Sequence, residues 1–248
     1  MKIDTLPPEI EPLCAGMPMV QFDYPYDRLL AASAAFRVVR YAKFHDAAAD
    51  TSHTLDPLKI EEYTSTKCPY PLLDADFLSN VPDALRDITT TVSEWVAPFA
   101  LPVVYRHYPV ENGDAASCAA WPQQIAFGPS TFRSPQRLRE NLIHEFCHQW
   151  HYILQEIVPF DRYPEFPRDL VLPSGTRGRT ASEVIGALHV SVALAVWRTR
   201  RGRQNDVAPL RAYAQGCVDV LGQNDERLTP LGRSMMSFLE RRMEVLSG

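Results

Sequence analysis

Residues 141–159 read NLIHEFCHQWHYILQEIVP, and this stretch decides the expected fold. Its apolar residues recur at helical spacing, which predicts one long amphipathic helix. Just upstream, Ser134-Pro135 is typical of a helix start, because serine caps the first turn and proline suits the first helical position. We therefore expect a helix that runs from this point to about Val158 and carries the HEFCH run in its middle.

The HEFCH run places two histidines, His144 and His148, four residues apart. Such positions lie about 40° apart around a helix and about 6 Å apart along it. Both imidazoles can then reach one metal ion at the usual bond length of about 2.0–2.1 Å. Glu145 follows the first histidine, and in HExxH hydrolases this glutamate takes a proton from the metal-bound water. The run predicts a divalent metal site with Glu145 as its catalytic residue.

A tight metal site needs a third protein ligand, and the next expected helix offers two candidates. Glu183 would complete the His-His-Glu set of zinc peptidases, or equally a two-histidine, one-carboxylate iron site. His189 would give a three-histidine site, and it lies in a mostly apolar run where a buried histidine needs a partner. The two positions are about 120° out of phase on a regular helix, so one ion is not expected to use both. We favour His189.

Two further residues of the HEFCH helix are interpreted differently. His151 shares a stripe with His144, but lies about 10 Å from it along the axis, too far for both to bind one ion. We expect His151 to be a partly buried polar residue, with contact to substrate as the alternative. Cys147 points away from the histidine stripe, and we expect it to pack in the core.

Composition limits the class of protein. The chain has 248 residues, of which 46% are hydrophobic, and a net charge of −5. We expect a single domain over residues 1–248, with the proline-rich residues 1–25 as an extended N-terminal arm. The sequence has no cluster of basic residues of the kind that binds nucleic acid. It also has no uncharged apolar stretch of about 18 residues, which a membrane span would need. Five cysteines without a CxxC pair, and no visible signal peptide, favour a reduced, cytoplasmic protein.

The remaining segments complete an expected fold that is mainly α with a small β-sheet (α+β). Pro102–Val110 and Cys118–Phe127 are rich in β-branched and aromatic residues, which predicts a hairpin or two neighbouring strands. This sheet directly precedes the HExxH helix, so we expect a zincin-like helical scaffold. Apolar periodicity and proline positions predict the other helices at Tyr26 to about Ala49, Pro82–Val96, 180–200, 207–221 and 230–246.

Two segments, Asn141–Pro159 and Gly178–Arg198, together resemble the HExxH-motif family of peptide natural-product biosynthesis. Members of that family carry a HEF-x-H helix, then a loop with an arginine, then a second helix with a histidine and a tryptophan-arginine end. The matching positions here are His144, Glu145, Phe146, His148, Leu154, His189, Val192, Trp197 and Arg198.

The resemblance implies an iron(II)- and 2-oxoglutarate-dependent oxygenase that hydroxylates an amino-acid side chain, such as an aspartate of a precursor peptide. A buried arginine near such a metal suits the distal carboxylate of 2-oxoglutarate, and Arg177 and Arg179 are the nearest candidates. The chain departs from the family pattern in two places. The arginine loop reads Arg177-Gly178-Arg179 rather than arginine-proline, and the spacing from His189 to Trp197 differs by about one residue.

Three hypotheses follow from these features. The first is the iron(II)/2-oxoglutarate hydroxylase, which we favour, acting on an amino-acid or peptide substrate. The second is a zinc metallopeptidase with Glu145 as general base and Glu183 as third ligand. The third is a catalytically inactive HExxH fold that binds peptides, and the intact histidines and glutamate argue against it.

Overall fold

The computed structural model describes residues 11–45, 68–110 and 113–246 of the chain. These residues are mostly helical and include a small three-stranded sheet, which confirms the expected α+β class. The longer helices are α1 (Tyr26–His45), α4 (Val81–Thr91), α6 (Pro135–Ile157), α7 (Ala181–Arg200), α8 (Ala208–Gly222) and α9 (Pro230–Val245). Two single helical turns, α3 (Ala75–Leu78) and α5 (Val96–Phe99), flank α4.

Capping residues fix where the two central helices begin. The Ser134 hydroxyl accepts a hydrogen bond from the Arg137 amide at 3.2 Å, and Pro135 takes the first position of α6, as predicted. At the start of α7, the Thr180 hydroxyl accepts from the Glu183 amide while the Glu183 carboxylate accepts from the Thr180 amide. This reciprocal pair is a capping box, which satisfies two amides that a helix start otherwise leaves unpaired.

The sheet has the strand order β1-β3-β2, with β1 (Val104–His107), β2 (Ala115–Ala116) and β3 (Gln124–Phe127). β1 and β3 pair in parallel, so the predicted hairpin between these segments is wrong, while their prediction as neighbouring strands is confirmed. Parallel strands need a crossover connection, and the chain between them forms β2, which pairs with β3 in the antiparallel direction.

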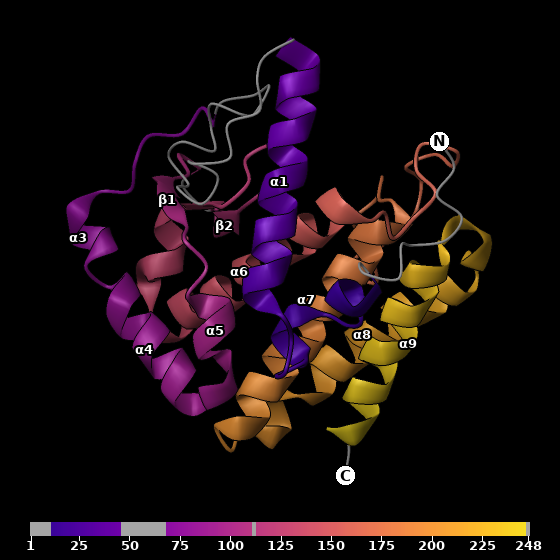
Figure 1. The fold of residues 1–248 in the computed structure, drawn as a ribbon. Helices are drawn as coiled ribbons and strands as arrows, with labels where there is room; N and C mark the ends of the chain where they lie inside the picture. The colour runs from indigo at the N-terminus through magenta and orange to yellow at the C-terminus, as the bar shows by residue number, and fades with distance from the viewer. Residues whose placement is uncertain (1–10, 46–67, 111–112, 247–248) are drawn as a thin grey trace.

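α7 is the central helix of the hydrophobic core, and it packs against α6, α8 and α9. α6 and α7 run antiparallel, because Glu140 pairs with Arg198 near one end and His151 meets Ser182 near the other. In Figure 1, α3, α4 and α5 lie on one side of this pair and α8 and α9 on the other. Among the described residues, α7 is the one helix long and apolar enough to cross a membrane, and 83% of its apolar stretch is buried inside the protein.

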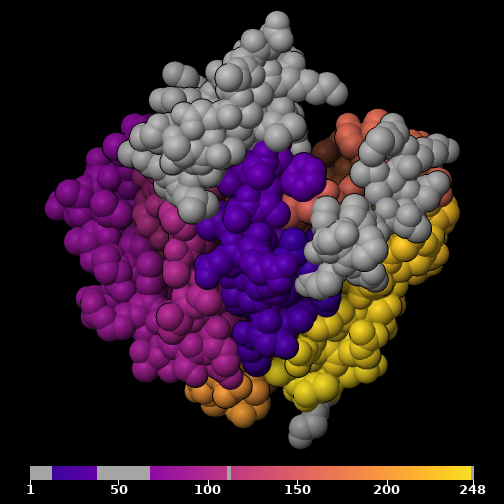
Figure 2. Space-filling view, viewed as in Figure 1, coloured from indigo at the N-terminus to yellow at the C-terminus, as the bar shows by residue number. Residues whose placement is uncertain are grey.

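α1 covers the α6 side of the core, and Figure 2 shows it in indigo between the α4 region and α9. Arg37 is only 5% exposed, and its Nη2 lies 2.7 Å from Glu156 Oε2 on α6, so a buried ion pair fastens the two helices. Residues 11–25 are the described part of the expected N-terminal arm. They form two 3-10 turns, where an extended chain was expected, and their Met17 and Met19 are fully buried.

Three expected segments differ from the structure or extend beyond it. The helix expected over Pro82–Val96 ends at Thr91, after the run Thr89-Thr90-Thr91, since β-branched residues have a lower helical propensity. α1 begins where predicted, but the end of that expected helix lies outside the described residues. The three expected C-terminal helices are confirmed as α7, α8 and α9.

Candidate metal centre

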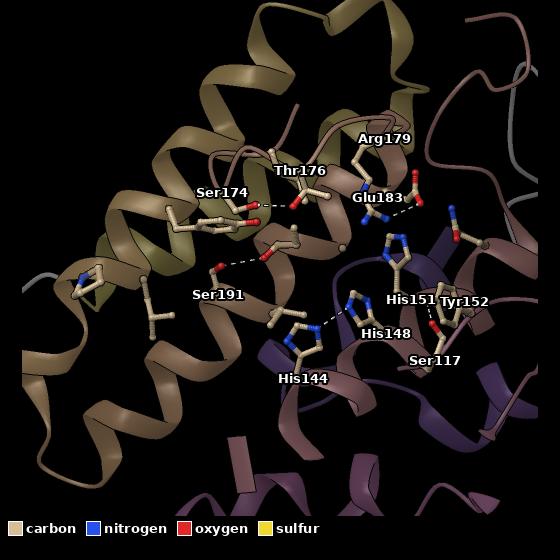
Figure 3. Close-up of a pocket in the computed structure, with 18 residues that line it drawn as sticks. Ser117, His144, His148, His151, Tyr152, Ser174, Thr176, Arg179, Glu183 and Ser191 are labelled. Atoms are coloured by element: carbon tan, nitrogen blue, oxygen red, sulfur yellow. Dashed lines mark hydrogen bonds and ion pairs between the residues drawn. The ribbon is translucent and has the colours of Figure 1, made fainter. Parts of the chain in front are cut away.

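His144 and His148 lie on consecutive turns of α6 with their rings turned toward each other (Figure 3). Their Nε2 atoms are 3.0 Å apart, and their ring centroids are 4.7 Å apart. Two nitrogens at this separation can both bond one metal ion at about 2.0–2.1 Å. The predicted spacing thus gives a converging pair of imidazole nitrogens.

The surroundings of His148 keep it neutral, which is the form that binds a metal. Burial lowers its pKa well below the usual value, and the neighbouring His144, His151, His189 and Arg179 lower it further. Its ring stacks on Tyr152, with centroids 6.0 Å apart and planes 13° from parallel. The Tyr152 hydroxyl donates to the Ser117 carbonyl at 3.2 Å, so Tyr152 is itself held in place.

Glu145 follows His144 on α6 and is only 3% exposed. Its Oε2 accepts a hydrogen bond from the Ser117 hydroxyl at 2.6 Å, and its Oε1 is 3.9 Å from His144 Nε2. Burial raises the pKa of this carboxyl, while the nearby His144 and the Ser117 hydrogen bond lower it. Glu145 is near a predicted ligand, but it is not among the residues that line the adjoining pocket.

That pocket has a volume of about 560 Å³ and lies between α6, α7 and α8. The two histidines form part of its α6 wall, and small residues of α7, among them Ala187 and Ser191, line the same pocket. The far side carries the hydroxyls of Ser174, Thr176 and Tyr213 beside apolar side chains. A small organic molecule can therefore lie against the histidine pair.

Glu183, one of the two candidate third ligands, lines the pocket but is already engaged. Its Oε2 accepts from the Thr180 amide at 2.8 Å in the capping box. Its Oε1 accepts from Arg168 at 2.8 Å and from Arg179 at 3.2 Å. As a metal ligand, Glu183 would have to give up part of this network.

His189, the favoured candidate, is fully buried, and its ring nitrogens have no hydrogen-bond partner among the described residues. Between the Glu140–Arg198 and His151–Ser182 contacts of the antiparallel α6–α7 pair, His189 lies about level with Phe146, between His144 and His148 along α6. Burial, together with a smaller effect of the nearby His151, lowers its pKa to about 3. An unpartnered buried imidazole at this level fits a metal ligand. It does not line the pocket, however, and within the described chain no three potential ligands converge on one point.

The two arginines expected near the metal are placed differently. Arg177 is exposed and does not line the pocket, whereas Arg179 is half-buried and does. The Nη1 of Arg179 donates to Glu183, and its Nε is buried without a hydrogen-bond partner in the described part of the chain. Of the two arginines, Arg179 is therefore the one that the structure places at the pocket.

Sequence reasoning missed Ser117 and Tyr152. Tyr152 lies four residues after His148, so the helical stripe through the histidines was sufficient to find it. Ser117 had no local pattern, since it reaches Glu145 only because the sheet packs beside α6. Gln149 makes that attachment: it accepts from the Gln123 amide at 2.7 Å and donates to the Gln124 carbonyl at 2.8 Å.

These residues fit a first-row divalent metal in part. His144 and His148 offer two converging imidazole nitrogens, and His189 is an unpartnered buried imidazole at the same level. Imidazole ligands suit iron(II) and zinc alike, so the donors do not choose between the two metals. No protein-family model matches the chain, and a search of the curated proteins found no match.

Proposed function

We propose that this protein is an iron(II)- and 2-oxoglutarate-dependent oxygenase that hydroxylates an amino-acid side chain, in a peptide natural-product precursor. His144, His148 and His189 would hold the metal, on a zincin-like scaffold formed by α6 and its adjoining sheet. The observation that carries the proposal is the shared pocket, which His144, His148 and Arg179 all line.

A three-histidine set leaves coordination positions open, which an oxygenase needs for its co-substrate and for oxygen. With iron(II) and 2-oxoglutarate bound, O2 would serve as the oxidant. A C–H bond, O2 and 2-oxoglutarate would then become C–OH, succinate and CO2. Arg179 is in place to bind a carboxylate of the co-substrate, since a guanidinium forms strong, directional bonds with carboxylates. The remaining wall, with Ser174, Thr176 and Tyr213, accepts the substrate side chain.

The alternative is a zinc metallopeptidase with Glu145 as base and Glu183 as third ligand, and both carboxylates argue against it. Glu183 is bound in the capping box and by two arginines. Glu145 is bonded to Ser117 and buried out of the pocket. Glu145 then acts by keeping His144 and the neighbouring Ser117 segment in position. All five cysteines are free, in keeping with our proposal of a reducing cytoplasmic location.

The source of the incorporated oxygen atom tests this proposal. The protein is loaded separately with iron(II) and with zinc, and each form is offered 2-oxoglutarate with a panel of amino acids and peptides. Under isotopically labelled O2, we expect the iron form to give a product that carries one labelled oxygen atom on an intact chain. If the zinc form cleaves peptides and takes its oxygen from labelled water, the peptidase replaces the oxygenase.

A further inference from the structure

A short hairpin, residues 170–179, contributes to the side of the pocket away from the histidine pair. Its two ends exchange a pair of backbone hydrogen bonds of 3.1 Å each, which closes the hairpin at its base. The chain turns at Gly175, whose φ of +86° is a conformation that glycine adopts readily and other residues do not. Ser174 and Thr176, on either side of this glycine, both line the pocket.

Packing against α8 fixes the tip of the hairpin. Pro173 lies directly over Gly216, where an added Cβ would be 2.7 Å from the proline Cγ. The missing side chain of Gly216 therefore allows the hairpin to approach the helix this closely. Tyr213, on the same helix, lines the pocket, and its hydroxyl is hydrogen-bonded to the side chain of Ser174. The packing thus brings a hairpin hydroxyl beside a hydroxyl of α8.

Ser174, Thr176 and Tyr213 together form a hydroxyl trio. The Ser174 Oγ and Thr176 Oγ1 atoms are 3.0 Å apart (Figure 3). Burial raises the pKa of Tyr213, so its phenol is protonated and uncharged. The two contacts within the trio use two of its three hydroxyl protons, which leaves one donor and several lone pairs for a ligand. Ser174 and Thr176 are exposed and Tyr213 is half-buried, so a molecule in the pocket can reach the trio.

The trio has no charged group of its own. Among the described residues that line the pocket, Arg179 carries the one guanidinium and Glu183 the one carboxylate, and they pair at 3.2 Å. In the proposed function Arg179 holds the co-substrate, which leaves no cation for a second carboxylate. A carboxylate only accepts hydrogen bonds and an ammonium only donates them, and each would bring an uncompensated charge. A carboxamide is uncharged and does both, so it matches the trio.

We infer that the hydroxyl trio is a specificity subsite, which binds the carboxamide of an asparagine or glutamine side chain in preference to the isosteric acid. Leu172, Val190 and Leu210 line the same pocket and suit the methylene groups of such a side chain. That the amide belongs to the hydroxylated substrate rests on the proposed function, whereas the subsite itself needs no metal. The inference departs from the aspartate that the family resemblance implies.

Binding to the metal-free, full-length protein tests the subsite without any turnover. Ligand-observed NMR titrations, which measure weak binding, use amino acids capped at both ends: asparagine and glutamine, the isosteric aspartate and glutamate, and leucine. Tyr213→Phe and Ser174→Ala each remove one hydroxyl of the trio. Tyr163→Phe is the matched control, because Tyr163 is exposed outside this pocket. Arg179→Gln identifies any acid probe that is held by the guanidinium rather than by the trio.

We expect Tyr213→Phe and Ser174→Ala each to weaken binding of both amides about three- to tenfold, as for loss of a hydrogen bond between uncharged groups. The same variants should leave the affinities for aspartate, glutamate and leucine unchanged, and Tyr163→Phe and Arg179→Gln should leave those for the amides unchanged. Thermal unfolding of each variant shows that it is folded. An equal loss for acids and amides, unchanged amide binding in both trio variants, or no amide binding by the wild type overturns the proposal.

Gly216→Ala tests the trio without altering any residue that lines the pocket. Its new Cβ displaces Pro173 and with it the hairpin, so binding of the amides should weaken about threefold or more. Gly222→Ala is the matched control, since a Cβ at this position of α8 meets nothing within 4 Å, and it should keep the wild-type affinity. Equal amide affinities in the two folded glycine variants would mean that the hairpin does not set the subsite, which also overturns the proposal.

Turnover separates this inference from the proposed function. Trio-dependent amide binding by a protein whose iron form makes no succinate upholds the subsite and refutes the oxygenase. Succinate formation by a protein whose amide binding does not depend on the trio does the reverse.

Discussion

The Nε2 atoms of His144 and His148 lie 3.0 Å apart across one turn of α6, at the wall of a pocket. The backbone of the helix sets this separation, and the stacked ring of Tyr152 supports His148 from the following turn. The sheet attached through Gln149 then brings Ser117 against Glu145. A pair held in this way loses little freedom when it binds an ion, because its rotamers are already set.

Removal of either histidine of the pair should abolish tight metal binding. His144→Ala and His148→Ala each leave a single nitrogen where two converged, and one imidazole does not hold a divalent ion tightly. Elemental analysis after anaerobic purification measures the bound metal. His107→Ala is the matched control, since His107 lies on β1 outside the pocket, and it should keep the wild-type content. Full metal content in either helix variant would place the site elsewhere.

The third ligand can be identified by comparing His189→Ala with Glu183→Ala. We expect His189→Ala to lose the metal, because it removes the unpartnered buried imidazole level with the pair. Glu183→Ala should keep the metal, but it should lower the free energy of unfolding by roughly 1 kcal/mol through loss of the capping box. Metal content and chemical denaturation measure the two effects. Loss of metal from Glu183→Ala with retention in His189→Ala would instead support a His-His-Glu site.

Glu145→Gln should reduce activity without eliminating it. Because Glu145 is buried and bonded to Ser117, we assign it a positioning role, and the loss should be about tenfold, equivalent to one strong hydrogen bond. Ser117→Ala should give a similar or smaller loss. A general base would behave differently, with a loss of roughly a hundredfold to ten-thousandfold while metal stays bound. The rate of succinate formation at equal metal content distinguishes the two roles.

Acid should destabilise the metal-free protein through its buried histidines. The pKa of His151 is lowered from its ordinary 6.5 to about 3 by burial, so below pH 6.5 the unfolded chain binds more protons than the folded one. The stabilising contribution is complete above pH 6.5 and is lost as the pH falls toward 3. Over this range the free energy of unfolding falls by about 1.4 kcal/mol per pH unit for each such histidine.

His189 has the same pKa shift and should contribute a similar slope. Denaturant titrations between pH 3 and 6.5 should therefore show a free energy of unfolding that depends less steeply on pH in His151→Asn than in the wild type. The expected difference is about 1.4 kcal/mol per pH unit. Identical slopes in the two proteins would mean that His151 is not held as a buried neutral imidazole.

Local patterns in the sequence predicted the helices well. α6, α7 and α9 are preceded by the capping residues Ser134, Thr180 and Thr229, and each cap side chain accepts a hydrogen bond from the first turn. The same local geometry brought His144 and His148 together, since four residues on one helix fix their separation. These predictions needed only contacts within a few residues, which is why they could be made from the sequence.

Contacts between distant segments could not be predicted in this way. The parallel pairing of β1 and β3 depends on a crossover that no turn residue specifies. Ser117 reaches Glu145 across 28 positions of sequence, through the packing of the sheet on α6. The pairing of Glu183 with Arg168, 15 positions away, likewise appears only in the folded chain. The sequence therefore predicted the histidine pair and left the partners of the nearby carboxylates open.

Succinate formation from 2-oxoglutarate is the most direct measurement of whether the His144–His148 pair forms an iron oxygenase site. The iron(II)-loaded wild type, the zinc-loaded wild type and iron-treated His148→Ala are each given 2-oxoglutarate and O2, with and without the peptide and amino-acid panel. We predict succinate from the iron-loaded wild type alone, formed faster when the true substrate is present. Peptide cleavage by the zinc form, with no succinate from the iron form under any condition, would contradict it.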